Sequence, residues 1–115
     1  MKTKLIEFSN TENKILRGIT SLPSRKIDMG VLCLHGFERC STTEKKFKSI
    51  SDNILDNHTA TLRFDFSGCG LSDGDFKFTT IEKQGLELID AIKAFQYETH
   101  ATKISIIAHS LGACV

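Results

Sequence analysis

The sequence predicts an α/β fold, in which an N-terminal β-hairpin precedes a β-α-β-α-β unit with a mostly parallel sheet. Three observations predict it. Short apolar runs of strand length alternate with two stretches of helical periodicity. Turn-forming residues separate the first two runs, and glycine-containing loops follow the later ones. Strands that alternate with helices pair in parallel through right-handed crossovers, so helices are expected to cover the sheet.

The first three strands are predicted at the N-terminal end of the chain. Residues 2–8 and 14–20 are short β-like runs, and the turn-rich spacer at 9–13 makes them a hairpin. Residues 21–28 read as a loop. Residues 29–37, "MGVLCLHGF", form a continuous apolar run, which is typical of a strand buried on both faces.

Two amphipathic helices are predicted between the later strands. Residues 41–57 begin with a capping-box spacing, Ser41 and Glu44, and residues 58–66 follow as a strand. The second helix is expected from about Thr80 to Glu98, with a capping box at Thr79 and Glu82, and the last strand at 104–108. Its apolar face is expected to hold Ile81, Gly85, Leu88, Ile92 and Phe95.

Composition argues against several classes of function. The net charge is +1, with 15 basic and 14 acidic residues, so no large positive field is available to bind nucleic acid. The N-terminus lacks the apolar core of a signal peptide, and no apolar stretch is long enough for a membrane span, so we expect cytoplasmic residence. The four cysteines show no CxxC pair or zinc spacing, so neither a metal site nor a disulfide framework is expected. Cys33 is expected to be a buried apolar residue.

The segment "AHSLGACV" has the pattern of a turn that presents a nucleophile. Ser110 follows a buried strand, and small residues, Ala108 and Gly112, lie two places to either side. A sharp strand-to-helix turn needs small residues there because strand and helix approach closely. The usual pattern has glycine at both positions, so Ala108 is a mild departure. The alternative, in which Ser110 is an ordinary helix N-cap, is less consistent with the strand before it.

The segment "HGF" supplies a second part of such a site. Acyl transfer produces an oxyanion, which backbone N–H groups stabilise by roughly 2.7–4 kcal/mol each. Leu111 follows the nucleophile, and Phe37 follows an earlier strand, so their N–H groups are the predicted donors. Gly36 lets the backbone turn toward the substrate. We expect His35 to be a hydrogen-bonded structural histidine and not a catalytic one.

Three segments together resemble the first half of an α/β-hydrolase fold protein: "VLCLHGF", "RFDFSGCGLSDG" and "ISIIAHSLGA". Their order is similar to that in bacterial esterases and serine-aminopeptidase-like hydrolases, which carry a variant of R-x-D-x-x-G-x-G-x-S-x-G. The resemblance covers nearly the whole chain from about residue 29. It implies a partial α/β-hydrolase fold, truncated after the nucleophile elbow, with residues 1–115 as a single incomplete domain. It also implies that Asp65 is mainly structural and braces the loop near the site.

A phosphate-binding loop is the rival interpretation of "GCGLSDG". Gly68, Gly70 and Gly74 give a spacing one residue longer than the dinucleotide fingerprint. However, "DFKF" separates this loop from the next helix, so no helix N-terminus would meet the phosphate. The sequence therefore favours the hydrolase interpretation.

The sequence after Ser110 is too short to supply a catalytic acid and base. In this fold they follow the serine in the order Asp or Glu, then His, and only five residues remain. The side chain of His109 should diverge from that of its neighbour Ser110, and His58 and His100 precede strands at the opposite end of the sheet. We therefore expect the chain alone to be inactive, with the 104–108 strand as an uncovered apolar edge.

Three hypotheses of function stay open at this point. The chain is an inactive fragment of a serine hydrolase, a half-enzyme completed by a separate C-terminal chain, or a non-enzymatic remnant or binding module. The resemblance implies a small-molecule ester as the substrate, and an amide only as the second choice. No metal or organic cofactor is implied, because acyl transfer by an activated serine needs none. We expect neither nucleic acid nor membrane as a partner.

Overall fold

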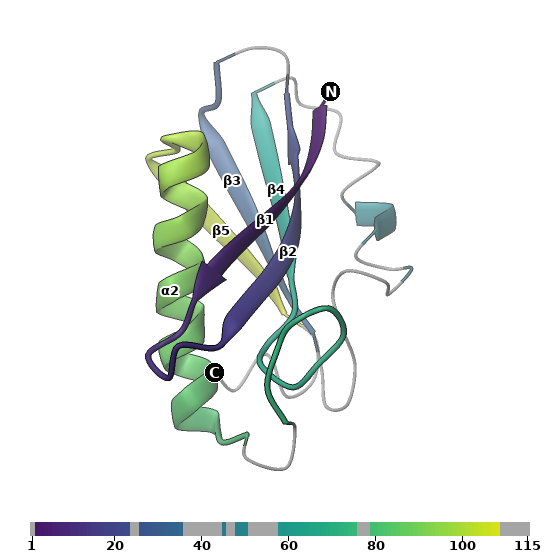
Figure 1. Ribbon diagram of the computed structural model, residues 1–115. Coiled ribbons are helices and arrows are strands. Elements are labelled where there is room, and N and C mark those ends of the chain that lie inside the picture. The colour runs from purple at the N-terminus through teal and green to yellow at the C-terminus, as the bar shows by residue number, and fades with distance from the viewer. Residues whose placement is uncertain are drawn as a thin grey trace.

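The computed structural model describes residues 2–23, 26–35, 45, 48–50, 58–75 and 79–108. Five strands and one long helix lie in these residues (Figure 1). In chain order they are β1 (Lys2–Ser9), β2 (Ile15–Leu22), β3 (Met29–Leu34), β4 (Thr59–Phe64), α2 (Ile81–Thr99) and β5 (Lys103–Ala108). The α/β class and the order of these elements are as the sequence predicts.

The five strands form one mixed sheet in the order β1-β2-β4-β3-β5. β3 pairs parallel with both β4 and β5, whereas β1 pairs antiparallel with β2, and β2 pairs antiparallel with β4. The predicted hairpin therefore joins the sheet beside β4. Among the described strands, β3, β4 and β5 form the parallel part of the sheet and the hairpin forms the antiparallel part, so the sheet is mixed. The reason is that the two strands of a hairpin, β1 and β2, are antiparallel to each other, and β2 forms a second antiparallel pair with β4.

The turn between β1 and β2 is stabilised by one asparagine side chain. Asn10 Oδ1 accepts hydrogen bonds from the N–H groups of Glu12 and Lys14, each at 2.9 Å. Asn13 adopts a left-handed conformation with φ 60°, which asparagine tolerates better than most residues. The predicted turn at 9–13 is thus built by local side-chain bonding, and β2 extends two residues beyond its expected end.

α2 begins one residue later than the capping-box prediction. Thr80 is the N-cap, with an extended backbone, and its Oγ1 accepts a hydrogen bond from the N–H of Lys83 at 3.1 Å. The prediction of a Thr79–Glu82 capping box is therefore wrong, because Thr80 takes the cap and Lys83 occupies the position that a capping box needs for Glu. The helix ends at Thr99 and is capped by His100, whose backbone is left-handed and whose N–H donates to Gln96 O at 2.7 Å.

The face that α2 presents to the sheet is partly the predicted one. Phe95 and Ala91 are fully buried, and Leu88 and Ile92 pack against the same core. Ile81 is instead exposed, and polar Gln84 and Glu87 are buried. The buried stripe thus begins on polar residues near the helix N-terminus.

The core lies between α2 and one face of the sheet. It consists mainly of alternate residues of β3 and β4 with two residues of α2: Leu32, Leu34, Ala60, Leu62, Phe64, Ala91 and Phe95. Gly30 permits the closest approach, because a Cβ there would lie 2.6 Å from Phe95 Cε2. Such tight packing makes the core sensitive to one added methyl group.

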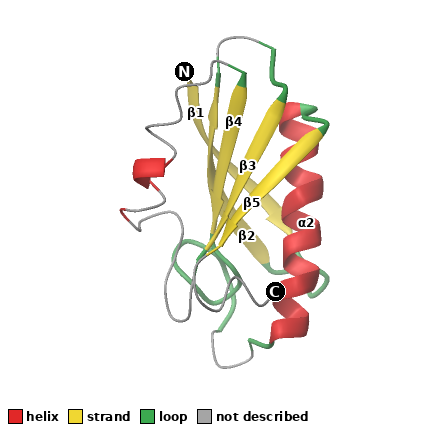
Figure 2. Cartoon of the chain, turned by 180° about the vertical axis from the view of Figure 1, so that it is seen from behind, coloured by secondary structure: helices red, strands yellow, loops and turns green. Residues whose placement is uncertain are grey.

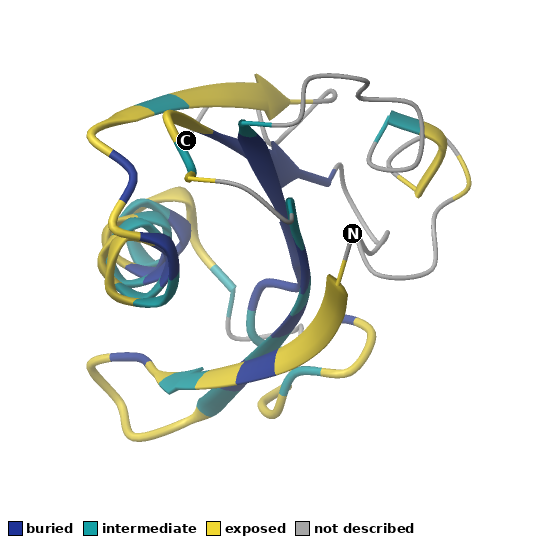
Figure 3. Ribbon diagram, turned by 90° about the horizontal axis from the view of Figure 1, so that it is seen from above, coloured by how far each residue is buried: buried dark blue, intermediate teal, exposed yellow. Residues whose placement is uncertain are grey.

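The opposite face of the sheet also carries buried side chains. Figure 3, seen from above, places α2 on one side of the buried strands and the helical residues 48–50 on the other. Val31, Cys33 and Thr61 are buried on this second face. The rest of the predicted helix at 41–57, except Lys45, lies outside the described residues. Burial of Cys33 confirms the sequence prediction and raises the pKa of its thiol to about 11.

Candidate active site

Three parallel strands end side by side at one edge of the sheet. Leu34, the last residue of β3, pairs with Ala108, the last residue of β5, and Cys33 pairs with Arg63 of β4. Figure 2 shows the ends of β3, β4 and β5 converging at the bottom of the sheet, opposite the N-terminus. In parallel sheets this carboxyl edge is where ligand-binding loops gather.

His35 is the first residue after β3 and is buried, with 2% of its surface exposed. Its Nε2 accepts a hydrogen bond from the N–H of Phe66 at 3.1 Å, and its ring stands edge-on to that of Phe66 at 5.0 Å. An Nε2 that accepts a hydrogen bond carries no proton, so the ring is neutral with its proton on Nδ1. The imidazole thereby links the end of β3 to the residues after β4.

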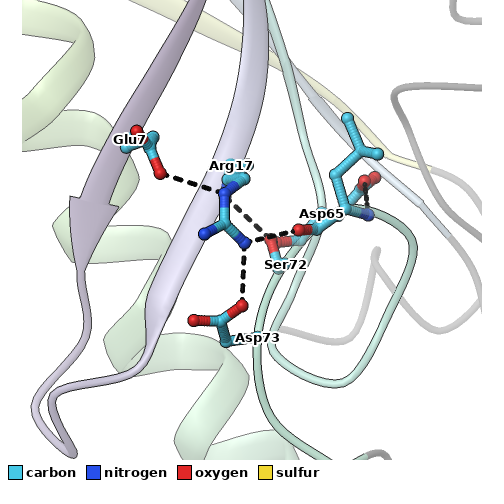
Figure 4. Close-up of polar contacts among 6 residues, drawn as sticks. Glu7, Arg17, Asp65, Ser72 and Asp73 are labelled. Carbon is cyan, nitrogen blue, oxygen red and sulfur yellow. Dashed lines mark hydrogen bonds and ion pairs between the residues drawn. The ribbon is translucent and has the colours of Figure 1, made fainter.

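Asp65 is fully buried directly after β4, and it supports the loop that follows. Its Oδ2 accepts a hydrogen bond from the N–H of Leu71 at 2.9 Å (Figure 4). Its own N–H donates to Arg17 O at 3.0 Å, and its carbonyl accepts from the hydroxyl of Ser72. The side chain and both backbone groups of Asp65 are therefore engaged in holding residues 65–72 beside β2.

Arg17 of β2 binds the same loop from the outside. Its guanidinium donates to Leu71 O and to Asp73 Oδ1, each at 2.8 Å, and to Glu7 Oε2 at 3.0 Å (Figure 4). The hydrogen bond from Arg17 lowers the pKa of Asp73. Backbone bonds add to this attachment, since the N–H of Arg17 donates to Ser72 Oγ at 2.8 Å.

Glu87 of α2 holds the loop from the other side and was missed by sequence reasoning. It is 2% exposed, and its two carboxylate oxygens accept from the N–H of Ser67 and from Asn10 Nδ2, both at 2.9 Å. The sequence does contain one sign that Glu87 is buried, because it lies at helical spacing from Ala91 and Phe95. A carboxylate on a buried stripe needs partners, which only the fold identifies.

The loop after β4 uses its N–H groups internally. Four of them donate within the chain: Gly68 to Asp73 O, Cys69 to Phe66 O, Leu71 to Asp65 and Ser72 to Cys69 O. A phosphate cradle requires such groups to point at a ligand, so the geometry disfavours the phosphate-loop alternative. Gly74 has φ 111°, a value that L side chains rarely adopt, which explains why glycine closes the loop.

Most residues of the predicted catalytic machinery lie outside the described residues. These are Gly36, Phe37, Ser110, Leu111 and Gly112. Among the described histidines, His58 and His100 lie at the opposite end of the sheet. The carbonyl of His58 accepts from the N–H groups of Asp28 and Met29 at the start of β3, and His100 precedes β5.

The described residues contain no candidate metal site and no candidate membrane span. No group of three or more His, Cys, Asp or Glu in this part of the chain is arranged to hold a metal ion. No helix in it is long and apolar enough to cross a membrane. The cytoplasmic location stays a prediction.

The fold is closely similar to solved hydrolase structures, although no family model and no curated protein matches the sequence. An esterase of Pyrococcus furiosus, Pf2001, matches with TM-score 0.81 and 28% identity over 97% of this chain and 43% of its own. The esterase Est1E of Butyrivibrio proteoclasticus, solved with ferulic acid, matches with TM-score 0.80, 24% identity and coverages of 93% and 43%. The α/β hydrolase GrgF of a Penicillium species matches with TM-score 0.81, 20% identity and coverages of 97% and 39%.

The extent of these matches is as informative as their quality. Each aligns almost all of this chain, and the chain spans only about 40% of the length of the structures that it matches. The sheet order and the strand directions described above belong to that shared portion. The chain therefore has the α/β-hydrolase fold, over the N-terminal half of that fold.

Proposed function

We propose that this chain carries the nucleophile half of a serine hydrolase that cleaves a carboxylic ester, with an amide as the second substrate class. The observation that supports this most is the side-by-side ending of β3 and β5 at Leu34 and Ala108. In the sequence, Gly36 and Phe37 follow the first of these ends, and Ser110 and Leu111 follow the second. A nucleophile and two oxyanion donors would thus start from neighbouring strands.

In the proposed reaction, Ser110 Oγ attacks the carbonyl carbon of the ester while a general base takes the hydroxyl proton. The carbonyl oxygen becomes an oxyanion, which accepts hydrogen bonds from the N–H groups of Phe37 and Leu111. The tetrahedral intermediate then collapses, the ester C–O bond breaks, and the alcohol leaves with the proton from the base. Water, activated by the same base, hydrolyses the acyl-serine.

The supporting residues would fix the loops from which these groups project. Gly36 and Gly112 would provide room for the turn after each strand. His35 would hold the end of β3 against Phe66, consistent with its accepting hydrogen bond, and Asp65 would hold the loop after β4. None of these roles requires proton transfer by His35, whose Nε2 already accepts the Phe66 N–H.

The base and its acid partner are proposed to come from polypeptide beyond residues 1–115. In the order of this fold they follow the serine. His58 and His100 lie at the far end of the sheet, which supports a base from elsewhere.

A fluorophosphonate probe tests the proposal. We expect no labelling of Ser110 in the chain alone, and labelling once the chain is combined with a polypeptide that supplies the late acid and histidine. Ser110→Ala should abolish that labelling. Ser105→Ala should retain it, because Ser105 is exposed in the middle of β5. Labelling that survives Ser110→Ala would contradict the nucleophile assignment, and labelling of Ser110 in the chain alone would contradict the external base.

A further inference from the structure

The side of α2 that faces away from the sheet carries large apolar side chains. Leu86 is 48% exposed, Ile89 is 49% exposed and Tyr97 is 79% exposed. At 100° per residue, these three lie about 120–180° around the helix from the buried Phe95. Figure 3 shows α2 at the margin of the molecule, with this side directed away from the sheet. We call it the outer face of α2.

Two charged residues of opposite sign, Asp90 and Lys93, occupy the middle of the outer face. Neither of them forms an ion pair within the described part of the chain. Asp90 Oδ2 is shielded from solvent and accepts no hydrogen bond from the described residues. Burial raises the pKa of Asp90, although the positive charge of Lys93 opposes the shift. A carboxylate in this position would gain from a further cation.

The outer face complements itself about a two-fold axis. Consider an axis that crosses α2 midway between Asp90 and Lys93 and makes two copies of the helix antiparallel. Asp90 of each copy then faces Lys93 of the other, so that two equivalent ion pairs form. Leu86 lies one turn before Asp90, and Tyr97 lies one turn after Lys93, so Leu86 of each copy faces Tyr97 of the other. The same axis therefore satisfies both the charges and the apolar side chains.

A membrane surface fits the outer face less well. Helices that lie on anionic lipid carry mainly lysine and arginine beside their apolar residues. Here Asp90 and the exposed Glu82 outnumber Lys93. A second copy of this chain, in contrast, supplies both the cation for Asp90 and the anion for Lys93.

We propose that the outer face of α2 is a dimerisation surface, on which a second copy of this chain binds with its α2 antiparallel. The contact consists of one helix of 19 residues from each copy. Such an interface buries less than the about 1,200–2,000 Å² of a stable complex, so we expect a weak dimer with a dissociation constant on the order of 100 µM.

Sedimentation equilibrium of the full chain at increasing concentration measures the dimer. Tyrosine fluorescence reports on the contact itself, because Tyr97 is the only tyrosine and the chain has no tryptophan. We expect acrylamide quenching of Tyr97 to fall at least about twofold as the dimer forms, because the interface centre excludes solvent. Ser110→Ala should dimerise equally well, so the measurement is independent of the proposed function.

Charge reversal tests the predicted pairing. Asp90→Lys alone should weaken the dimer at least about tenfold, because each ion pair becomes a contact between two lysines. Lys93→Asp alone should do the same with two aspartates. An equimolar mixture of the two variants should form a heterodimer about as tight as the wild-type dimer, since every contact then joins a lysine to an aspartate. Mixing changes neither chain, so this recovery cannot come from a repaired fold.

Two substitutions of leucine by glutamate locate the surface. Leu86→Glu should weaken the dimer at least about tenfold, because it places a carboxylate against Tyr97 of the other copy. Leu5→Glu is the matched control, since Leu5 is 54% exposed and lies on β1, whose neighbouring residue Ile6 points into the core beneath α2. It should change the dissociation constant by less than about twofold. Circular dichroism verifies that both variants stay folded.

Three results would overturn the proposal. The first is a chain that stays monomeric up to about 1 mM, ten times the expected dissociation constant. The second is a dimer that Leu5→Glu weakens as much as Leu86→Glu does, or a mixture of the two charge variants that does not recover the dimer. The third is binding of the monomer to vesicles of anionic lipid that Leu86→Glu abolishes, which would assign the outer face to a membrane.

Discussion

The substitutions Glu87→Gln and Asn10→Asp, made singly and together, test how the loop after β4 is held. Together they exchange the hydrogen-bond donor and the acceptor between the two side chains. Glu87 accepts from Ser67 N–H and from Asn10 Nδ2, while Asn10 Oδ1 accepts from the N–H groups of Glu12 and Lys14. In Glu87→Gln, one carboxylate oxygen becomes an NH2 group that faces another donor. Asn10 cannot relieve this by turning its amide over, because its Oδ1 is held by two backbone donors.

The cost follows from the burial of the pair. Both residues are less than 10% exposed, and a buried donor left without an acceptor costs about 1–3 kcal/mol. Glu87→Gln should therefore lower the free energy of unfolding by about 1–3 kcal/mol. Asn10→Asp should cost more, since it places two carboxylates together and one must take a proton. The double variant restores one donor facing one acceptor, with a coupling energy of about 1–3 kcal/mol.

Urea unfolding followed by circular dichroism measures these differences. For a small domain, the slope of about 1–3 kcal/mol per molar urea turns a 2 kcal/mol loss into a midpoint shift of about 1 M. We expect the double variant to unfold at higher urea than either single variant. Strictly additive losses would refute the reasoning, because they would show that Glu87 and Asn10 do not bond to each other.

Two further predictions concern a loop glycine and a buried thiol. Gly74→Ala should lower the free energy of unfolding by about 1–3 kcal/mol, because φ is 111° and the new Cβ would lie 3.1 Å from Gly68 N. Gly85→Ala should raise it by about 0.5–1 kcal/mol, since nothing lies within 4 Å of its Cβ and alanine favours helix; equal effects in urea unfolding would contradict this contrast. Burial raises the pKa of the Cys33 thiol from 9.0 to about 11, so as pH rises the unfolded chain loses this proton before the folded chain does. The contribution of the thiol to stability is therefore present below pH 9 and is lost as pH rises through 11. Unfolding measured from pH 8 to 11 should show a steeper alkaline loss in the wild type than in Cys33→Ala, and identical slopes would count against the shift.

Much of the fold follows from sequence patterns that are local. The continuous apolar run that begins at Met29 predicts a doubly buried strand, and β3 has that burial. The hairpin follows from two β-like runs around a turn-rich spacer, because asparagine bonds to nearby backbone groups wherever such a turn forms. Phe95 and Leu88 occur at helical spacing, which predicts the face that α2 packs on the core. The place where the hairpin joins the sheet does not follow, because pairing between distant strands leaves no periodic signal.

For the candidate site, the sequence by itself determined the chemical groups: a serine after an apolar strand, a His-Gly-Phe segment and an Asp-started glycine loop. Their residue types and spacing are local, so the chain carries them in any conformation. Only the tertiary structure decided that β3 and β5 end side by side and that His35 accepts a hydrogen bond from the N–H of Phe66. It also decided that Arg17 and Glu87 both form hydrogen bonds with the loop after β4. These contacts join residues 20 or more positions apart, and the cost of buried unpaired polar groups selects them only once the sheet has formed.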